Sequence, residues 1–156
     1  SRRRQRQMCI RCRKECIAYL MIAVESSFTT RIADESISTA NLLCCNVSQS
    51  ESSIKVCALA STFPTCVCTD TADAQGDKVT VHLLCGGWVT YECVAAGAIA
   101  PGVPVYTAPS GKVQVLPTSA GTYYFLGYSL STAAANNSPV RCVLGIPQKI
   151  IIEAQP

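Results

Sequence analysis

The hydrophobic pattern of this chain is clearest between Gly76 and Gly145, where apolar and polar residues alternate in short runs. In the run Lys78–Cys85, every second residue from Val79 onward is apolar, and His82 falls among the alternate positions. A period of two is typical of a strand that buries one face. The pattern therefore predicts a strand here, with His82 on its outward face as a surface residue.

Comparable runs predict further strands, separated by Gly, Pro, Ser and Asn residues that favour turns. They are Ile22–Thr30, Leu42–Val47, Ile54–Leu59, Pro64–Cys68, Trp88–Val94, Pro104–Thr107, Lys112–Leu116, Tyr123–Leu130 and Val140–Ile146. Ile146 is expected to face inward, Arg31–Asn41 to be a loop or a single helical turn, and Thr118–Thr122 to be a loop. Many short strands at even spacing indicate an all-β fold, either a small β-barrel or a sandwich.

The C-terminal tail carries three consecutive isoleucines, Ile150, Ile151 and Ile152. An exposed run of this kind tends to pair edge to edge with other strands. We therefore expect a C-terminal strand that is added to the chain's own sheet or to a neighbour's. These three residues are the predicted partner-binding surface of the tail.

The central stretch resembles the small capsid decoration, or cement, proteins of tailed bacteriophages. Their sequences contain a GDxVxV strand, a glycine before an apolar strand, the segment AAGAIAxGxxVY, a GKV turn and strand, GTYxxLG, an Ala-rich loop and a final apolar strand. The pieces that match, in the same order, are Gly76–Val81, Gly87–Val89, Ala95–Tyr106, Gly111–Val113, Gly121–Gly127, Thr132–Asn136 and Val140–Leu144. More loosely, the resemblance reaches back to about Arg31.

The resemblance implies a β-barrel that binds the outer surface of an icosahedral phage capsid and clamps neighbouring subunits together. The implied partner is the major capsid protein, and the implied location is the virion. Because members of the family commonly form trimers, we expect a homo-oligomer, with a trimer favoured. The basic N-terminal extension is longer and the cysteine content higher than the family leads one to expect.

The net charge of +3 is divided unevenly along the chain. Residues 1–14 hold seven basic residues and no acidic one, whereas the remainder is acidic, with six basic and ten acidic residues. The seven are Arg2, Arg3, Arg4, Arg6, Arg11, Arg13 and Lys14. We therefore distinguish an arm, residues 1–24, from a decoration domain, residues 25–156. Such an arm is expected to contact an acidic or phosphate-bearing surface, most simply on a neighbouring protein, with packing on its own domain as the alternative.

Eleven cysteines are many for a chain of 156 residues. A secreted disulfide framework is one interpretation of this number. However, Cys85, Cys93 and Cys142 fall within apolar strand runs, where a small hydrophobic residue belongs. We predict mostly reduced cysteines that fill the core, and leave open one or two disulfides after a particle leaves the reducing cytosol.

Two groups of residues have the chemistry of metal ligands. Cys9, Cys12 and Cys16 have the spacing C-x2-C-x3-C, which supplies three zinc ligands without a second pair. We favour thiols packed in the arm or at an interface, with zinc as the alternative. The other group lies in an acidic loop and consists of Asp70, Asp73 and Asp77. The loop lacks the residue pattern of a calcium-binding loop, so we interpret these acids as solvated.

No combination of residues in the sequence indicates catalysis. His82 is the single histidine and has no acidic neighbour, so a Ser-His-Asp or Cys-His arrangement lacks support. The sequence contains no Walker A, G-x-G-x-x-G or nucleophile-elbow motif. We predict a structural protein rather than an enzyme, with no cofactor. No apolar run reaches the length of a transmembrane helix, so no membrane partner is expected.

Two other functions remain as alternatives. The arginines of residues 2–14 would neutralise several phosphates in a nucleic-acid-binding module, although the arm lacks interleaved aromatic residues and the body is acidic. A secreted, disulfide-stapled surface protein would explain the cysteine content. DNA binding that is lost on deletion of residues 2–14 would favour the first, and a count of free thiols would test the second.

Overall fold

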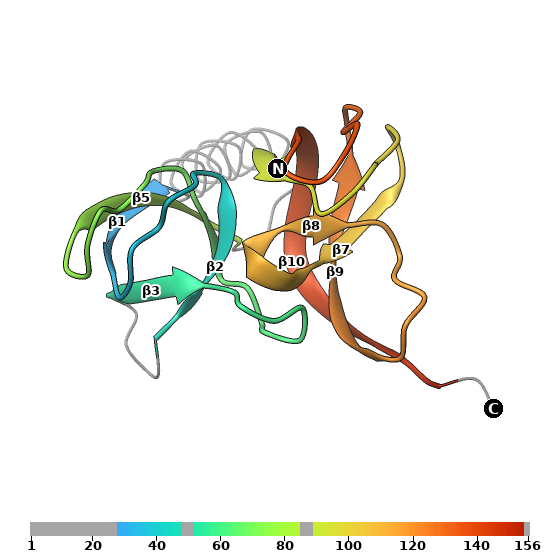
Figure 1. Ribbon diagram of the computed structural model, residues 1–156, viewed down its shortest axis with the longest axis horizontal. Helices are drawn as coiled ribbons and strands as arrows, with labels where there is room; N and C mark the ends of the chain where they lie inside the picture. The colour runs from blue at the N-terminus through green and yellow to red at the C-terminus, as the bar shows by residue number, and fades with distance from the viewer. Residues whose placement is uncertain (1–27, 48–51, 85–88, 155–156) are drawn as a thin grey trace, which may run out of the picture.

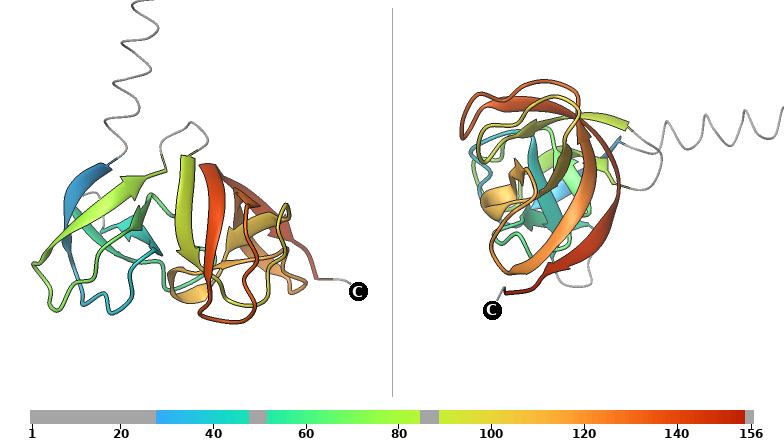
Figure 2. Two further views of the ribbon diagram at one scale, coloured as in Figure 1. Left: turned by 90° about the horizontal axis from the view of Figure 1, so that it is seen from above. Right: turned by 90° about the vertical axis from the view of Figure 1, so that its right-hand side faces the viewer.

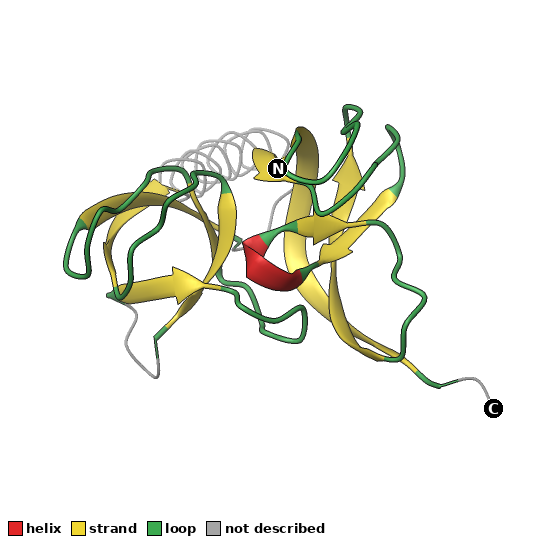
Figure 3. Ribbon diagram, viewed as in Figure 1, coloured by secondary structure: helices red, strands yellow, loops and turns green. Residues whose placement is uncertain are grey.

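The computed structural model describes residues 28–47, 52–84 and 89–154. Nearly all the regular structure in these ranges is β-strand, arranged as two sheets side by side (Figure 1, Figure 3). The prediction of an all-β fold is confirmed. Among the residues described, no helix has the length and hydropathy needed to cross a membrane.

The first sheet is a closed barrel of five short strands. These are β1 (Phe28–Ala33), β2 (Leu42–Asn46), β3 (Ser53–Val56), β4 (Cys66–Cys68) and β5 (Lys78–Leu83). Their order around the barrel is β1-β3-β2-β4-β5, and β5 pairs with β1 to close it. β1 and β3 run parallel, and the other neighbouring pairs are antiparallel. Closure pairs the backbone groups that an open sheet leaves at its edges.

The second sheet is antiparallel and curves around its own core (Figure 2). Its strands are β6 (Val89–Val94), β7 (Pro104–Thr107), β8 (Val113–Gln114), β9 (Gly121–Ser129) and β10 (Pro139–Ile152), in the order β6-β10-β9-β7-β8. The short 3-10 helix η1 (Pro109–Gly111) connects β7 to β8 and lies between the two halves (Figure 3).

Strand β2 joins the two halves because it is buried on both faces. Cys44 points into the barrel interior, whereas Leu43 and Cys45 belong to the core of the second sheet, with Leu126 and Leu144. A strand buried on both sides reads as a continuous apolar run, here LLCC, rather than as an alternation. Strand β2 therefore lies between the core of the barrel and the core of the curved sheet.

Helix η1 is docked on the barrel by backbone contacts. The amide of Gly111 donates to the carbonyl of Cys57 at 2.8 Å, and the amide of Ser110 donates to that of Ala58 at 3.1 Å. Gly111 has a φ of +69°, and a Cβ at this position would lie 2.7 Å from the carbonyl oxygen of Leu43. Only glycine combines this φ with so close an approach of two backbones.

Several boundaries predicted from the sequence are wrong. β1 continues to Ala33, beyond the predicted start of a loop at Arg31, because Arg31 pairs with Val79 of β5. β9 begins at Gly121, inside the predicted loop, because this residue pairs with Ile152 of β10. In each case a distant strand supplies the backbone partners, and that information is absent from the local pattern.

Strand β10 also differs from the prediction. It runs without a break from Pro139 to Ile152, so the tail belongs to the chain's own sheet. A bulge between Leu144 and Gln148 shifts its register against β9. Ile146 lies in this bulge and is 59% exposed, so the prediction that it faces inward is wrong. A bulge adds residues to one strand only and thereby breaks the alternation of faces.

Candidate functional site

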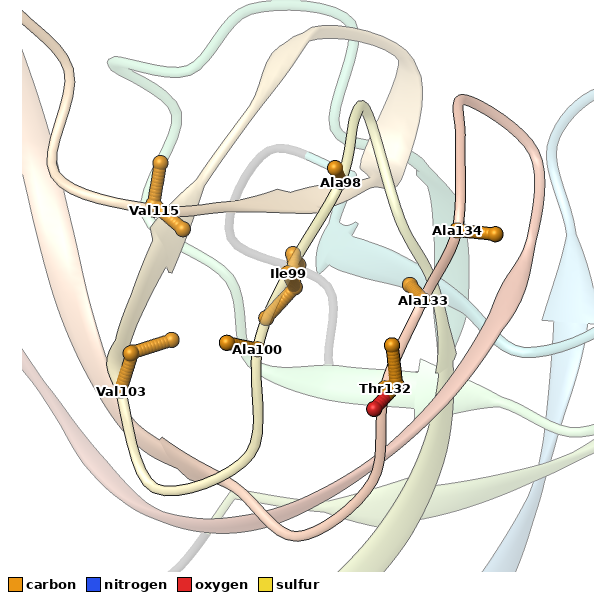
Figure 4. A pocket seen from close by; sticks show the side chains of 8 residues that line it. All are labelled: Ala98, Ile99, Ala100, Val103, Val115, Thr132, Ala133 and Ala134. Carbon is orange, nitrogen blue, oxygen red and sulfur yellow. The ribbon is translucent and has the colours of Figure 1, made fainter.

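Two alanine-rich loops of the second sheet meet and enclose an apolar concavity. The β6–β7 loop and the β9–β10 loop are joined by Ile99 and Ala133, which exchange two backbone hydrogen bonds of 3.0 and 2.9 Å. The concavity between them has a volume of about 510 Å³ and opens to solvent (Figure 4). Its lining residues are Ala98, Ile99, Ala100, Val103, Val115, Thr132, Ala133 and Ala134.

A buried serine fixes the backbone of two residues that line this concavity, Ala100 and Val103. Ser129, which is 1% exposed, donates from its hydroxyl to the carbonyl of Ala100 at 2.6 Å. The same hydroxyl accepts a hydrogen bond from the amide of Val103 at 3.1 Å. These bonds and the Ile99–Ala133 pair fix the loops to β9, so the concavity is part of the folded scaffold.

The chemistry of the concavity is that of apolar contact. None of its eight lining residues is charged or titratable, and Thr132 supplies the only polar side chain among them. General acid–base or nucleophilic chemistry requires such groups. The surface therefore suits an apolar side chain of a partner.

Three aromatic side chains form a second exposed group, on the outer face of β7 and β9. Tyr106 lies 5.7 Å from Phe125, and Phe125 lies 5.6 Å from Tyr128, between ring centroids. Tyr128 is 43% exposed, and the other two rings are half-buried. Exposed aromatic rings are enriched in protein–protein contacts, so this face is a further candidate for a partner.

The predicted tail site forms the end of β10. Ile150, Ile151 and Ile152 pair with Tyr123, Thr122 and Gly121 of β9. Ile151 is 66% exposed, whereas Ile150 and Ile152 are half-buried. This pairing answers the question left open by the sequence, because the tail strand adds to its own sheet. Its role in partner binding stays a prediction.

His82 is not the surface residue that the strand pattern predicted. It is 7% exposed and stacks on Phe28 of β1, with ring centroids 3.7 Å apart, and it contacts Tyr91 of β6 at 4.6 Å. Burial lowers the pKa of His82, because the charged imidazolium is disfavoured away from water. The strand was predicted correctly, but a barrel strand that meets a second sheet is covered on its outer face as well.

The acidic loop uses its carboxylates to hold its own backbone. One oxygen of Asp77 accepts hydrogen bonds from the amides of Asp73 and Ala74, at 2.9 and 3.0 Å. Asp70 accepts from the amide of Thr80 at 2.8 Å. Over the described ranges, no group of three or more Cys, His, Asp or Glu side chains is arranged to hold a metal ion. Two of the three acids therefore have a structural role that the sequence did not reveal.

The cysteines whose positions are described are buried and carry free thiols. They are Cys44, Cys45, Cys57, Cys66, Cys68, Cys93 and Cys142. This agrees with the prediction of reduced, core-filling cysteines for Cys93 and Cys142, which lie in the core of the second sheet. Cys85 lies outside the described residues, as do the three cysteines of the arm.

The pKa values of these thiols reflect burial and contacts between thiols. Burial raises the pKa of Cys66 to about 12. A hydrogen bond from Cys57 lowers the pKa of Cys45 to about 7, and the pKa of Cys57 rises in return. A hydrogen bond with Cys142, together with burial, raises the pKa of Cys93. Each close pair therefore keeps at least one thiol protonated in the core.

The predicted arm site lies outside the described residues. This applies to Arg2, Arg3, Arg4, Arg6, Arg11, Arg13 and Lys14, and to the possible zinc ligands Cys9, Cys12 and Cys16. Their roles stay predictions.

Comparison with protein families gives a direct match. The model of the family described as phage cement protein matches residues 50–144, which include the concavity, the aromatic group and strands β3 to β9. The chain belongs to the phage cement protein family. The resemblance seen in the sequence motifs is thereby confirmed. As a cement protein, it is a structural protein of the phage virion and associates with the phage capsid.

A solved structure shares the fold of this cement protein. It is the crystal structure of the N base of head fiber gp8.5 in bacteriophage phi29, with a TM-score of 0.58 and 19% sequence identity. The similarity covers 81% of this chain and 98% of that chain. Among curated proteins no match was found. At this level of identity the structural likeness supports the fold alone.

The sequence motifs of the cement protein pointed to its concavity without revealing it. Ala95–Tyr106 and Thr132–Asn136 are pieces of the resemblance, and the small polar stretch Ser131–Pro139 suits a flexible or partner-contacting loop. The two pieces contribute seven of the eight residues that line the concavity. The available signal was that two small-residue loops, far apart in the chain, recur in one family. Their contact became visible only through the pairing of Ile99 with Ala133.

Proposed function

We propose that this cement protein binds the outer surface of the phage capsid and stabilises the shell by bridging neighbouring capsid subunits. The observation that carries the proposal is the match of the cement protein family to residues 50–144, the segment that builds the exposed concavity. A surface without charge suits a persistent contact, since apolar area removed from water stabilises the bound state.

The proposed partners are the major capsid protein and further copies of this chain, and three surfaces share the contacts. The body contributes the concavity, and the tail contributes Ile150, Ile151 and Ile152. The arm contributes its basic residues Arg2, Arg3, Arg4, Arg6, Arg11, Arg13 and Lys14 against an acidic surface. Several weak contacts on different subunits reinforce one another, because binding at one raises the effective concentration at the next.

We further propose that the protein acts as a homo-oligomer, with a trimer favoured. A symmetric cluster presents each surface several times and therefore spans several capsid subunits at once. No cofactor and no membrane take part in this role.

The test uses capsids from which the protein has been stripped. The purified full chain is expected to re-bind and to raise the temperature at which the capsid disrupts. Deletion of residues 1–14 is expected to weaken re-binding while the body remains folded. A matched pair of variants separates charge from length: replacing the seven basic residues by Gln should act like the deletion, whereas replacing the six arginines by Lys should retain binding. Equal re-binding by the truncated chain would refute the role of the arm.

The charge of the arm also favours a second candidate, nucleic-acid binding. Filter binding of DNA at low salt distinguishes the two. Tight binding that disappears when residues 2–14 are deleted would favour this candidate. If the truncated and full chains bind DNA equally poorly, while only the full chain re-binds capsids, the cement function is supported.

A further inference from the structure

Among the described residues, the end of β10 has a paired strand on one side only. Beyond the bulge, residues Gln148–Ile152 pair with Gly121–Phe125 of β9 on one side. The other neighbour of β10 is β6, and the pairs between described residues of these two strands run from Pro139 to Leu144 of β10. Within the described part of the chain, the outer edge of Gln148–Ile152 therefore has no strand beside it. This two-stranded extension projects away from the sheet toward the C-terminus (Figure 1, Figure 2).

This edge carries one charged residue, Lys149, of the kind that limits pairing with other chains, and its remaining residues favour pairing. No proline interrupts Gln148–Ile152, and three of its five residues are isoleucine. Ile151 is 66% exposed. A two-stranded extension is only marginally stable alone, so addition of a further strand would satisfy its backbone groups and cover its apolar side chains.

The sequence of the edge is complementary to itself. Residues 149–153 read Lys-Ile-Ile-Ile-Glu, with a positive charge at one end and a negative charge at the other. We propose that this strand pairs antiparallel with the same strand of a second copy, in the register that places Ile151 opposite Ile151. Lys149 of each copy then faces Glu153 of the other, and Ile150 faces Ile152.

The backbone geometry of an antiparallel ladder permits this register. Opposed residues must both direct their hydrogen-bonding groups toward the partner strand, or both direct them away. Here the numbers of any two opposed residues differ by an even amount, so each pair shares the same orientation. A shift by one residue would violate this rule, and a shift by two would place a charged residue opposite an isoleucine.

Both faces of the paired strands would be matched. Lys149, Ile151 and Glu153 share one face, and all three are exposed. Pairing gives this face an isoleucine pair between two ion pairs. On the other face, the half-buried Ile150 and Ile152 would contact their counterparts and extend the apolar surface that Tyr123 begins. Cross-strand pairs of opposite charge and of β-branched residues both stabilise a sheet.

The pairing has two-fold symmetry and joins two copies of the chain, so it cannot be the contact that holds the three copies of a trimer together. It would instead join copies that belong to adjacent trimers and link them across the shell. In this respect the inference rests on the proposed function, which places several copies on one capsid, and it assigns the isoleucines of the tail to contact with a second copy. Strand pairing itself is measurable in solution without capsids.

The experiment measures self-association of the full chain by sedimentation velocity over a wide range of concentrations at low salt. Lys149→Glu and Glu153→Lys each convert two opposite-charge contacts into like-charge contacts. Each variant is expected to weaken the pairing step about tenfold. The double variant Lys149→Glu/Glu153→Lys restores complementarity and should associate like the wild type. An equal mixture of the two single variants should associate more strongly than either alone.

Ile151→Asp should abolish the pairing step because two carboxylates would then face each other. Leu59→Asp is the matched control, since Leu59 is 63% exposed and lies in the loop between β3 and β4, outside β10. Circular dichroism should give the same spectrum for all variants. The proposal is overturned if the wild type shows no pairing step, or if the single variants associate as strongly as the wild type. It is also overturned if the mixture of the two single variants associates no more strongly than either variant alone. Failure to re-bind capsids would leave these results unchanged and would count against the proposed function alone.

Discussion

His82 and Phe28 stack face to face, with ring centroids 3.7 Å apart and an angle of 19° between the ring planes. The two residues are paired across β5 and β1, where the barrel closes. Tyr91 of β6 contacts His82, with ring centroids 4.6 Å apart, and its hydroxyl donates to the carbonyl of Leu83 at 3.0 Å. The single histidine thus lies where the barrel meets the second sheet.

The stability of the protein should therefore depend on pH through His82. Burial lowers its pKa in the folded state, so the unfolded chain, with a pKa near 6.5, binds the proton more readily. The histidine's contribution is fully present above about pH 6.5 and is lost as the pH falls through the lower pKa of the folded state. Urea unfolding at several pH values should show a steeper loss of stability below this pH in the wild type than in His82→Gln. Identical pH profiles would contradict the assignment.

Gly127→Ala should severely destabilise the second sheet. A Cβ on Gly127 would lie 2.0 Å from the carbonyl oxygen of Val143, and the residue has a φ of +154°. The clash of this Cβ with the carbonyl oxygen can be removed only if β9 and β10 move apart. We therefore expect a loss of about 3 kcal/mol or more in unfolding free energy. Gly97→Ala is the control, because a Cβ there meets no atom within 4 Å. Equal stability of the two variants in thermal unfolding would refute the packing argument.

Asp77→Ala should cost about 1 kcal/mol of stability through the two backbone hydrogen bonds that its carboxylate accepts. Asp73→Ala is the comparison within the same loop, since the amide of Asp73, rather than its side chain, makes the contact. We expect this second variant to unfold like the wild type. A stabilising effect of calcium that disappears in Asp77→Ala would instead indicate a metal-binding loop.

Cys142→Ser should be less stable than Cys142→Ala. Cys142 is 0% exposed and acts as a small apolar residue in the core of the second sheet. A serine hydroxyl buried without a good partner costs about 1–3 kcal/mol, whereas alanine leaves only a small cavity. Chemical unfolding of the two variants checks this order. If serine is tolerated as well as alanine, the site is more polar than its neighbours indicate.

The positions of most strands were accessible from the sequence because one-sided burial imposes a period of two. This holds for β5, β6 and β7, where the predicted and observed ranges nearly coincide. The motifs between Gly76 and Leu144 also led to the correct family, and the apolar runs correctly placed Cys93 and Cys142 in the core. These are properties of local sequence, so no knowledge of distant contacts was needed.

Only the tertiary structure decided which strands pair and what covers each face. Alternation identifies a buried face but not its partner, so the closure of the barrel at β1 and the burial of His82 were not predicted. The bulge before Gln148 turned Ile146 outward and shifted the register in which the end of β10 pairs with β9. Ile99 and Ala133 formed the concavity through backbone bonds between loops far apart in the chain. Such contacts depend on long-range register, which a local pattern of polar and apolar residues does not encode.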